Sequence, residues 1–304
     1  MSARTIAQVT LLAVCLIWGM NFTAMHLMLQ RLQPLDVIFL RTSIAATGFI
    51  VLLLLLRRPI PAFSRAEWLR LLMMGLLGVA VFNLATSYGQ SVLPASISSL
   101  LVSSSPIFTA ILATIFGVER ISRRMAAAIA IATIGLIVLV TWGRGASVAL
   151  NAQTLIAAGL LLLAPLSWAS YTVLNKPLLI RHPPLEIAGY SMIIGAAILA
   201  PLGIFNPARI ARIAQMDHIG WAAAFFSSIF SLIIAFVLFA RALRNLTPSE
   251  VAMSTYLTPI FAVLIAWALL GERPTPGLVA GGALIVIAIA IVSSRGITQP
   301  PEEG

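Results

Sequence analysis

The chain has 304 residues, of which 60% are hydrophobic and only 9% are charged. Average soluble domains carry about 45–50% apolar and about 25% charged residues, so this composition excludes an ordinary soluble enzyme or binding domain. The net charge of +10 does not indicate a nucleic-acid partner either, because the arginines fall in short gaps between apolar runs, where positive charge orients helices in a lipid bilayer.

Ten apolar runs follow one another along the chain, and most have the length of about 20 residues that crosses a bilayer as a helix. The runs cover residues 5–29, 35–56, 67–90, 95–116, 125–142, 153–175, 185–205, 219–241, 248–270 and 277–294. A β-barrel would show alternating segments of about ten residues, whereas these runs are continuous. We therefore predict an all-α membrane protein with ten transmembrane helices.

The positive residues between the runs predict the orientation. With a cytoplasmic N-terminus, thirteen arginine and lysine residues lie inside and five lie outside. Because positive residues concentrate on the cytoplasmic side, we predict that both termini are cytoplasmic, with residues 296–304 as a tail. Seven of the nine acidic residues lie at or near run ends and two lie in the tail, so the sequence offers no carboxylate at mid-membrane for a proton relay.

Short motifs recur at an offset of 150 to 154 residues. The matched pairs are Pro34-Leu35-Asp36-Val37 with Pro184-Leu185-Glu186-Ile187, Trp18 with Trp168, Pro94 with Pro248, Ser105-Pro106 with Thr258-Pro259, and Glu119-Arg120 with Glu272-Arg273. Each unit holds five runs, and five is odd, so the second unit must enter the membrane from the opposite face. We predict two inverted-topology five-helix repeats, residues 1–147 and 148–295, an architecture typical of secondary transporters.

Four motifs in this order resemble the EamA-type branch of the drug/metabolite transporter superfamily over residues 5–295. They are Trp18-Gly19-Met20-Asn21-Phe22, Phe39-Leu40-Arg41, Ser105-Pro106 followed by Glu119, and Leu257-Thr258-Pro259 followed by Gly271-Glu272. The resemblance implies ten helices, a central solute cavity and a place in the bacterial inner membrane. Among family members, the chain looks most similar to bacterial aromatic amino acid exporters. The second half departs from the first where Ala169-Ser170-Tyr171 replaces Gly19-Met20-Asn21.

Polar and amphipathic side chains at membrane depth are the candidates for the substrate site, because lipid does not solvate them. The candidates are Trp18, Asn21, Asn83, Ser87, Tyr88, Ser99, Ser103, Trp168, Tyr171, Ser231 and Tyr256. The matched tryptophans lie deep in their runs and offer rings against which a flat apolar solute can stack. Two alternatives stay open: the serines only allow close helix packing, or the aromatic rings form belts at the membrane surface.

Two prolines and one arginine lie inside the runs. Pro106 and Pro259 each remove a backbone hydrogen bond, which predicts either a bend for gating or a static kink. Arg41 lies seven residues after Pro34, so its side chain either extends to the outer surface or binds a solute carboxylate.

These observations predict a secondary transporter that exports small metabolites, above all aromatic or other partly apolar amino acids, by alternating access through a central cavity. The alternatives are a drug or nucleoside-type efflux carrier, and a membrane scaffold or channel that does not transport. We expect no enzyme, because no nucleophile–base pair or His-Glu-x-x-His helix is present. The only lysine, Lys176, precedes Pro177, which excludes an ATP-binding phosphate loop. We expect no cofactor or metal, and a monomer whose partners are its substrate and the lipid bilayer.

Overall fold

The computed structural model describes residues 2–58, 61–93, 98, 101–141, 151–203, 207–270 and 276–293. These residues form helices and connecting turns without any strand, which confirms the all-α prediction for this part of the chain. The elements are α1 Ala3–Leu29, α2 Pro34–Leu55, α3 Arg65–Met74, η1 Gly75–Val81, α4 Phe82–Val92, α6 Ser105–Ile115, α7 Arg123–Thr141, α8 Ala152–Arg181, α9 Pro184–Leu199, η2 Ala200–Leu202, α10 Pro207–Ala214, α11 His218–Phe225, η3 Phe226–Ile234, α12 Ala235–Asn245, α13 Pro248–Ser254, α14 Leu257–Leu270 and α15 Pro276–Ser293.

Six helical segments of the described chain are long and apolar enough to cross a membrane. They are Ala3–Leu29, Pro34–Leu55, Arg65–Val92, Ala152–Arg181, Pro184–Leu202 and His218–Asn245. Shorter apolar helices add Ser105–Ile115 and Val279–Ala288. The structure therefore has the length and composition of a multi-pass membrane protein.

Local sequence accounts for where several helices begin. Pro34 and Pro184 stand in the first turns of α2 and α9, where a missing N–H leaves no hydrogen bond unmade. The side chain of Thr247 accepts a hydrogen bond from the Glu250 amide at 3.3 Å, and the Glu250 carboxylate accepts one from the Thr247 amide at 2.9 Å. This reciprocal cap fixes the start of α13.

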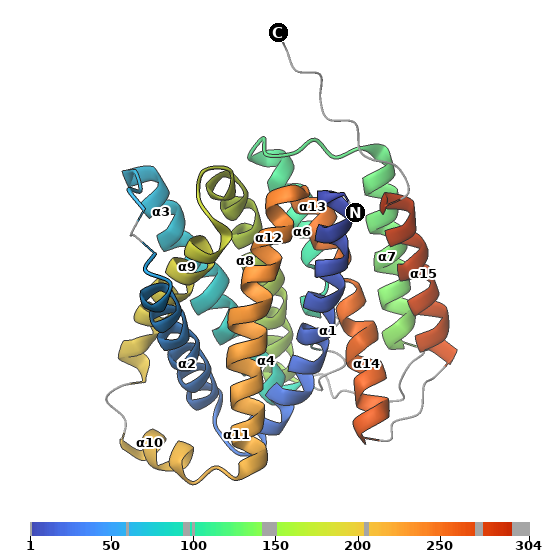
Figure 1. Cartoon of the computed structure of the whole chain (residues 1–304). Helices are drawn as coiled ribbons and strands as arrows, with labels where there is room; N and C mark the ends of the chain where they lie inside the picture. Colours follow the sequence, from blue (N-terminus) through green and yellow to red (C-terminus); the bar gives the residue numbers. More distant parts are fainter. Residues whose placement is uncertain are drawn as a thin grey trace.

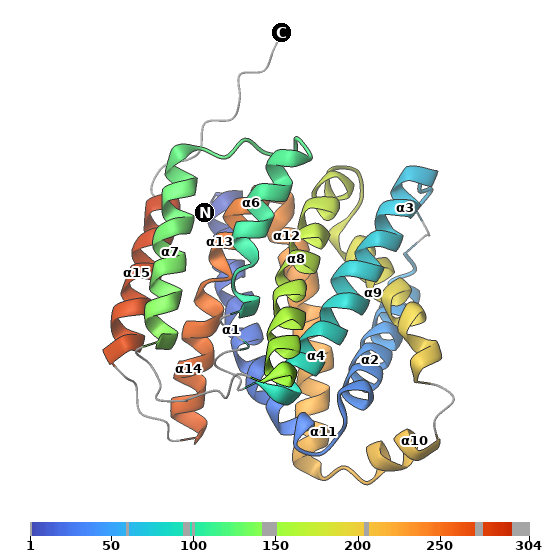
Figure 2. The same ribbon diagram turned by 180° about the vertical axis from the view of Figure 1, so that it is seen from behind.

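The two halves have matching elements that run in opposite directions. α3–η1–α4 and α11–η3–α12 both span 28 residues and both contain a π-helical segment. Figures 1 and 2 show α3 and α12 toward the end of the bundle where the N-terminus lies, and α4 and α11 toward the other end.

The contacts between helices are exchanged in the same way. α1 packs on α12 and α14, and its counterpart α8 packs on α4 and α6. α2 contacts η3, whereas α9 contacts η1, and α7 and α15 pack side by side. Most contacts thus join one half to the other, so neither half forms a core by itself.

The helices that hold the two mid-run prolines are broken, where the sequence predicted continuous runs with kinks. α6 begins at Ser105 directly after a turn, with Pro106 in its first turn. α13 ends at Ser254 and α14 begins at Leu257, so a short turn precedes Pro259. Because proline disfavours helix in the residue before it and suits the first helical turn, the chain starts a new helix at each site.

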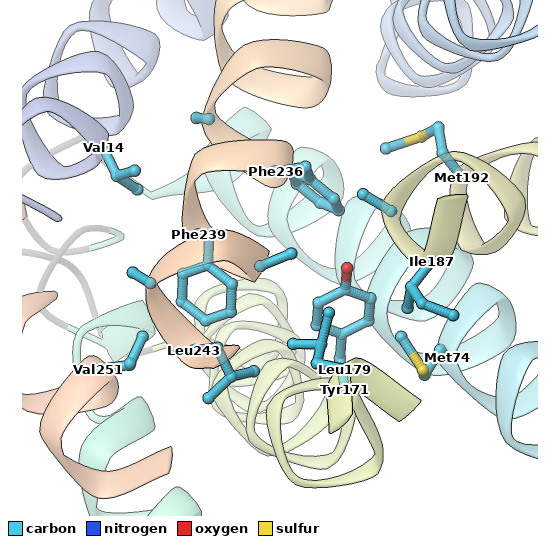
Figure 3. Packing of buried hydrophobic residues seen from close by; sticks show 14 of the residues in the cluster. Val14, Met74, Tyr171, Leu179, Ile187, Met192, Phe236, Phe239, Leu243 and Val251 are labelled. Carbon is cyan, nitrogen blue, oxygen red and sulfur yellow. The ribbon is translucent and has the colours of Figure 1, made fainter. Parts of the chain in front are cut away.

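Apolar side chains fill the bundle on the N-terminal side. Figure 3 shows Tyr171, Phe239, Leu243 and Val251 packed together, and all four are buried. α10 was not predicted from the sequence. Its buried Arg209 binds the carboxylate of Asp36, in the first turn of α2, at 2.7 Å.

We predict that Gly195→Ala lowers the melting temperature of the purified protein in detergent. A Cβ on Gly195 would lie 2.3 Å from the Val79 Cβ and 2.7 Å from the Gly75 carbonyl oxygen, and such overpacking costs about 1–3 kcal/mol. Gly159 on α8 has nothing within 4 Å of its Cβ position, so Gly159→Ala is the control and should not lower the melting temperature. Equal melting temperatures for the two variants would contradict the close approach of α9 and η1.

Candidate functional site

A partly open cavity lies between the two halves, with an empty volume of about 780 Å³ including the part open to its surroundings. Its walls come from α1, α2, α4, α6, α8, η3, α12 and the break between α13 and α14. The lining residues are Trp18, Asn21, Phe22, Met25, Arg41, Phe82, Thr86, Gln90, Val102, Ser103, Ser105, Trp168, Ser231, Leu232, Phe236, Thr255 and Thr258.

Aromatic rings form one wall of the cavity. The rings of Trp18 and Trp168 meet edge to face, with centroids 5.2 Å apart and an interplanar angle of 88°. Phe82 and Phe236 approach Trp168 from α4 and α12 at 5.4 and 5.3 Å. The Trp18 indole N–H donates to the Ser231 carbonyl at 3.3 Å, which ties α1 to η3. This wall has its orientation fixed before any solute arrives.

Neutral polar groups lie beside these rings. The Ser227 hydroxyl donates to the Asn21 side-chain oxygen at 2.5 Å. The Thr258 hydroxyl lines the cavity and is buried without a hydrogen-bond partner. No lining residue in the described ranges is acidic, so the cavity can donate hydrogen bonds but has no negative charge of its own.

Arg41 brings the only charge to the described lining. Its side chain does not extend to the surface, because the residue is only 3% exposed. Nη1 lies 3.0 Å from the Met25 sulfur and 3.3 Å from the Asn83 side-chain oxygen, and Nε has no partner. A guanidinium stays charged in proteins, so a positive charge lies in the cavity wall with only neutral acceptors beside it.

Five of the predicted site residues meet at the cavity: Trp18, Asn21, Ser103, Trp168 and Ser231. Two others stand directly behind its lining. Asn83 is buried between Arg41 and the Val79 carbonyl, to which it donates at 2.7 Å. Tyr171 stacks on Trp168 with centroids 4.9 Å apart.

The other predicted residues lie elsewhere. Tyr88 is 39% exposed and does not line the cavity. Ser87 is buried outside the lining, and its hydroxyl has no partner. Tyr256 is buried against α7, where its hydroxyl lies 2.9 Å from that of Thr133. Ser99 falls outside the described residues.

Several residues that line the cavity were not predicted from the sequence. They are Phe22, Phe82, Thr86, Phe236, Thr255 and Thr258. Phe22 and Thr258 belong to the motifs quoted above, so the sequence could have indicated them. Phe82 and Phe236 could not be predicted as site residues, because a phenylalanine in an apolar run is equally compatible with a side chain that faces lipid or the protein core.

Polar contacts join equivalent elements at the two ends of the bundle. Arg31, after α1, binds the Asp217 carboxylate at the start of α11 with two contacts of 2.7 and 2.9 Å. Arg31 and the amide of Gly220 lower the pKa of Asp217 to about 2. At the other end, the Glu67 carboxylate in α3 lies 3.1 Å from His182, after α8. Equivalent elements are therefore joined by a polar contact at each end of the bundle.

The cavity is closed toward the N-terminal end of the bundle. Leu179, Leu243 and Val251 pack together there (Figure 3), and the Lys176 ammonium donates to the carbonyls of Leu243 and Leu246 at 2.8 Å. The polar lining extends the other way, to Gln90 in the last turn of α4. We expect access from the end of the bundle where α4 ends, because the lining reaches Gln90 there.

Comparisons with known proteins agree with this architecture. The EamA-like transporter family matches residues 5–141 and 155–294. A crystal structure with 18% sequence identity superposes with a TM-score of 0.76 over 95% of this chain and 96% of that chain, which shows a shared fold.

Several named relatives are similar over most of the chain. A probable terminal-alkyne amino-acid exporter of Streptantibioticus cattleyicolor is 29% identical over 73% of this chain and 71% of its own length. A probable amino-acid metabolite efflux pump of Salmonella typhimurium is 26% identical over 92% of both chains. An uncharacterized transporter of Archaeoglobus fulgidus is 27% identical over 90% of this chain and 94% of its own.

We predict that Gln90→Cys reacts with a membrane-impermeant thiol reagent from the face opposite the N-terminus only. Gln90 lies at the open end of the cavity, whereas the native Cys15 is fully buried and should not react. Leu243→Cys, at a fully buried position of the closed end, is the control and should stay unlabelled from either face. Labelling of Gln90→Cys in sealed vesicles of both orientations measures this, and reaction from the N-terminal face would contradict it.

Proposed function

We propose that this chain, which belongs to the EamA-like transporter family, exports amino acids with aromatic or other partly apolar side chains. The observation that carries the proposal is the cavity between the two halves, where the rings of Trp18 and Trp168 stand beside the polar side chains of Asn21 and Arg41. An amino acid has the same division, with polar groups at one end and an apolar side chain at the other.

Two independent observations support this substrate class. Relatives at modest identity bear the names amino-acid exporter and amino-acid metabolite efflux pump. In addition, the rigid aromatic wall suits a flat apolar group, since ring pairs gain about 0.5–1.5 kcal/mol beyond area burial. A strongly hydrated solute would lose its water there without replacement.

Transport follows from the exchange of contacts between the halves. We assign residues 1–147 and 148–295 to two inverted repeats of five helices, which makes ten crossings. Because each half packs mainly on the other, a rocking motion that opens one end closes the equivalent contacts at the other end. The breaks before Pro106 and Pro259 are the bend points in this proposal. The cavity lies within one chain, so a monomer suffices.

We predict that the protein resides in a bacterial inner membrane with both ends in the cytoplasm, so that the open end of the cavity faces outward. The positive residues between the helices favour this orientation. Fusion of a reporter that is active only in the cytoplasm to either terminus should give activity in both cases. Activity at one terminus alone would contradict an even number of crossings.

We predict that the purified protein in liposomes exchanges labelled for unlabelled phenylalanine, and that Trp168→Ala lowers this exchange by about tenfold or more. Removing the ring opens the aromatic wall, and truncating a buried tryptophan at a binding site commonly costs 2 kcal/mol or more. Trp68→Ala is the matched control, because Trp68 is 42% exposed at the start of α3 and outside the cavity; it should exchange as the parent does.

The outcomes of the exchange assay separate the candidate functions. A scaffold or channel gives no accelerated exchange of labelled for unlabelled solute. Exchange of nucleosides or hydrophobic drugs without exchange of amino acids would replace the proposed substrate class and leave the carrier mechanism in place.

A further inference from the structure

We propose that Arg41 binds the carboxylate of the solute, and that the cavity recognises this carboxylate by charge but recognises an amino group only through neutral hydrogen bonds. The inference deepens the proposed function and rests on it, because the proposed function is what makes the bound solute a transported one. It predicts that acids without an amino group bind, and that amides and esters of amino acids bind at least about tenfold more weakly than the acids.

The positive charge on α2 is not balanced by a described neighbour. Arg41 is 3% exposed, and its hydrogen-bond partners are a thioether and an amide oxygen at 3.3 Å. Neither neutralises a guanidinium, and Nε is left unpaired. A buried cation at membrane depth is costly unless it is paired. An anion that enters the cavity would therefore be stabilised by pairing with this guanidinium.

The guanidinium of Arg41 is held in place by a neighbouring side chain. Asn83 holds one guanidinium nitrogen from the side of α4 and is itself fixed by the Val79 carbonyl at 2.7 Å. The guanidinium therefore has a set orientation in the wall that Met25 and Phe82 share with it. A planar fork with fixed orientation matches the two oxygens of a carboxylate.

Arg41 has no opposing charge in the described lining. Within the described lining, no aspartate or glutamate stands where it could pair with Arg41 or with a solute ammonium. The positions that match Arg41 and Asn83 in the second half are Ser191 and Phe236, so the cation has no symmetric counterpart. The carboxylate is thus directed to the first half, and the apolar part of the solute to Trp168 and Phe236.

The competing explanation is that Arg41 only supports packing between α2, α1 and α4. The two explanations differ in one respect. If Arg41 is structural, removing it destabilises the empty protein; if it awaits an anion, Arg41→Met leaves the empty protein as stable as the parent or more so, because an unpaired buried charge is lost.

The test is thermal unfolding in detergent with matched acid and amide pairs: phenylalanine with phenylalaninamide, and 3-phenylpropanoate with 3-phenylpropanamide. We expect each acid to raise the melting temperature at a concentration at least about tenfold lower than its amide, since a charge-assisted hydrogen bond is lost in the amide. Arg41→Met and Arg41→Gln should abolish this preference, and Arg41→Lys should keep part of it. Arg241→Gln, which removes an exposed positive charge from α12, is the control and should keep all of it.

The comparison of acid with amide in the parent protein needs no variant, so it stands even if a variant fails to fold. Equal responses to acid and amide, or no response to any acid, would overturn the assignment of Arg41. A preference for acids that persists in Arg41→Gln would also overturn it. A preference for acids together with no phenylalanine exchange in liposomes would support the role of Arg41 and reject the proposed transport of amino acids.

Discussion

Lipid offers no hydrogen-bonding partner, and this constraint determines how the polar side chains of the chain are placed. Several buried hydroxyls return to a carbonyl of their own helix, as Thr42 does to Ile38 at 2.8 Å and Ser228 to Ala224 at 2.7 Å. Other polar side chains bond between elements: Ser227 donates to Asn21, and Arg41 donates to Asn83. A polar cavity inside an apolar bundle follows directly from this sorting.

The fold could be predicted closely because its signals are repeated. Apolar runs of bilayer length mark the helices, and the described helices lie within a few residues of those runs. Pro34 and Pro184 mark equivalent helix starts, so the second half supports the first. The family was also predicted correctly, since its motifs lie at fixed positions in both halves. The short α10 was missed because a helix of 8 residues has too few positions to show a period.

The site could be predicted only in part, because polarity does not fix which face of a helix points inward. On α4, the sequence favoured the stripe of Asn83 and Ser87, whereas Phe82 and Thr86 line the cavity. The π-helical segment η1 precedes this stretch and shifts its phase relative to α3, which α-helical periodicity does not anticipate. Tyr256 lies outside the cavity lining for a related reason: it follows the end of α13, and its hydroxyl contacts Thr133 on α7.

The two halves share a fold but contribute different chemistry to the cavity. At matched positions, the first half has Asn21, Arg41 and Asn83 where the second has Tyr171, Ser191 and Phe236. In the proposed transport cycle, symmetry of the backbone allows the two ends to open in turn, because equivalent contacts replace one another. Symmetry of the side chains is not needed for that motion, and it would give a solute two equal orientations. In the proposed carrier, the charge comes from Arg41 in the first half and the aromatic rings come from both halves, and this uneven placement would hold an amphipathic solute in a single orientation.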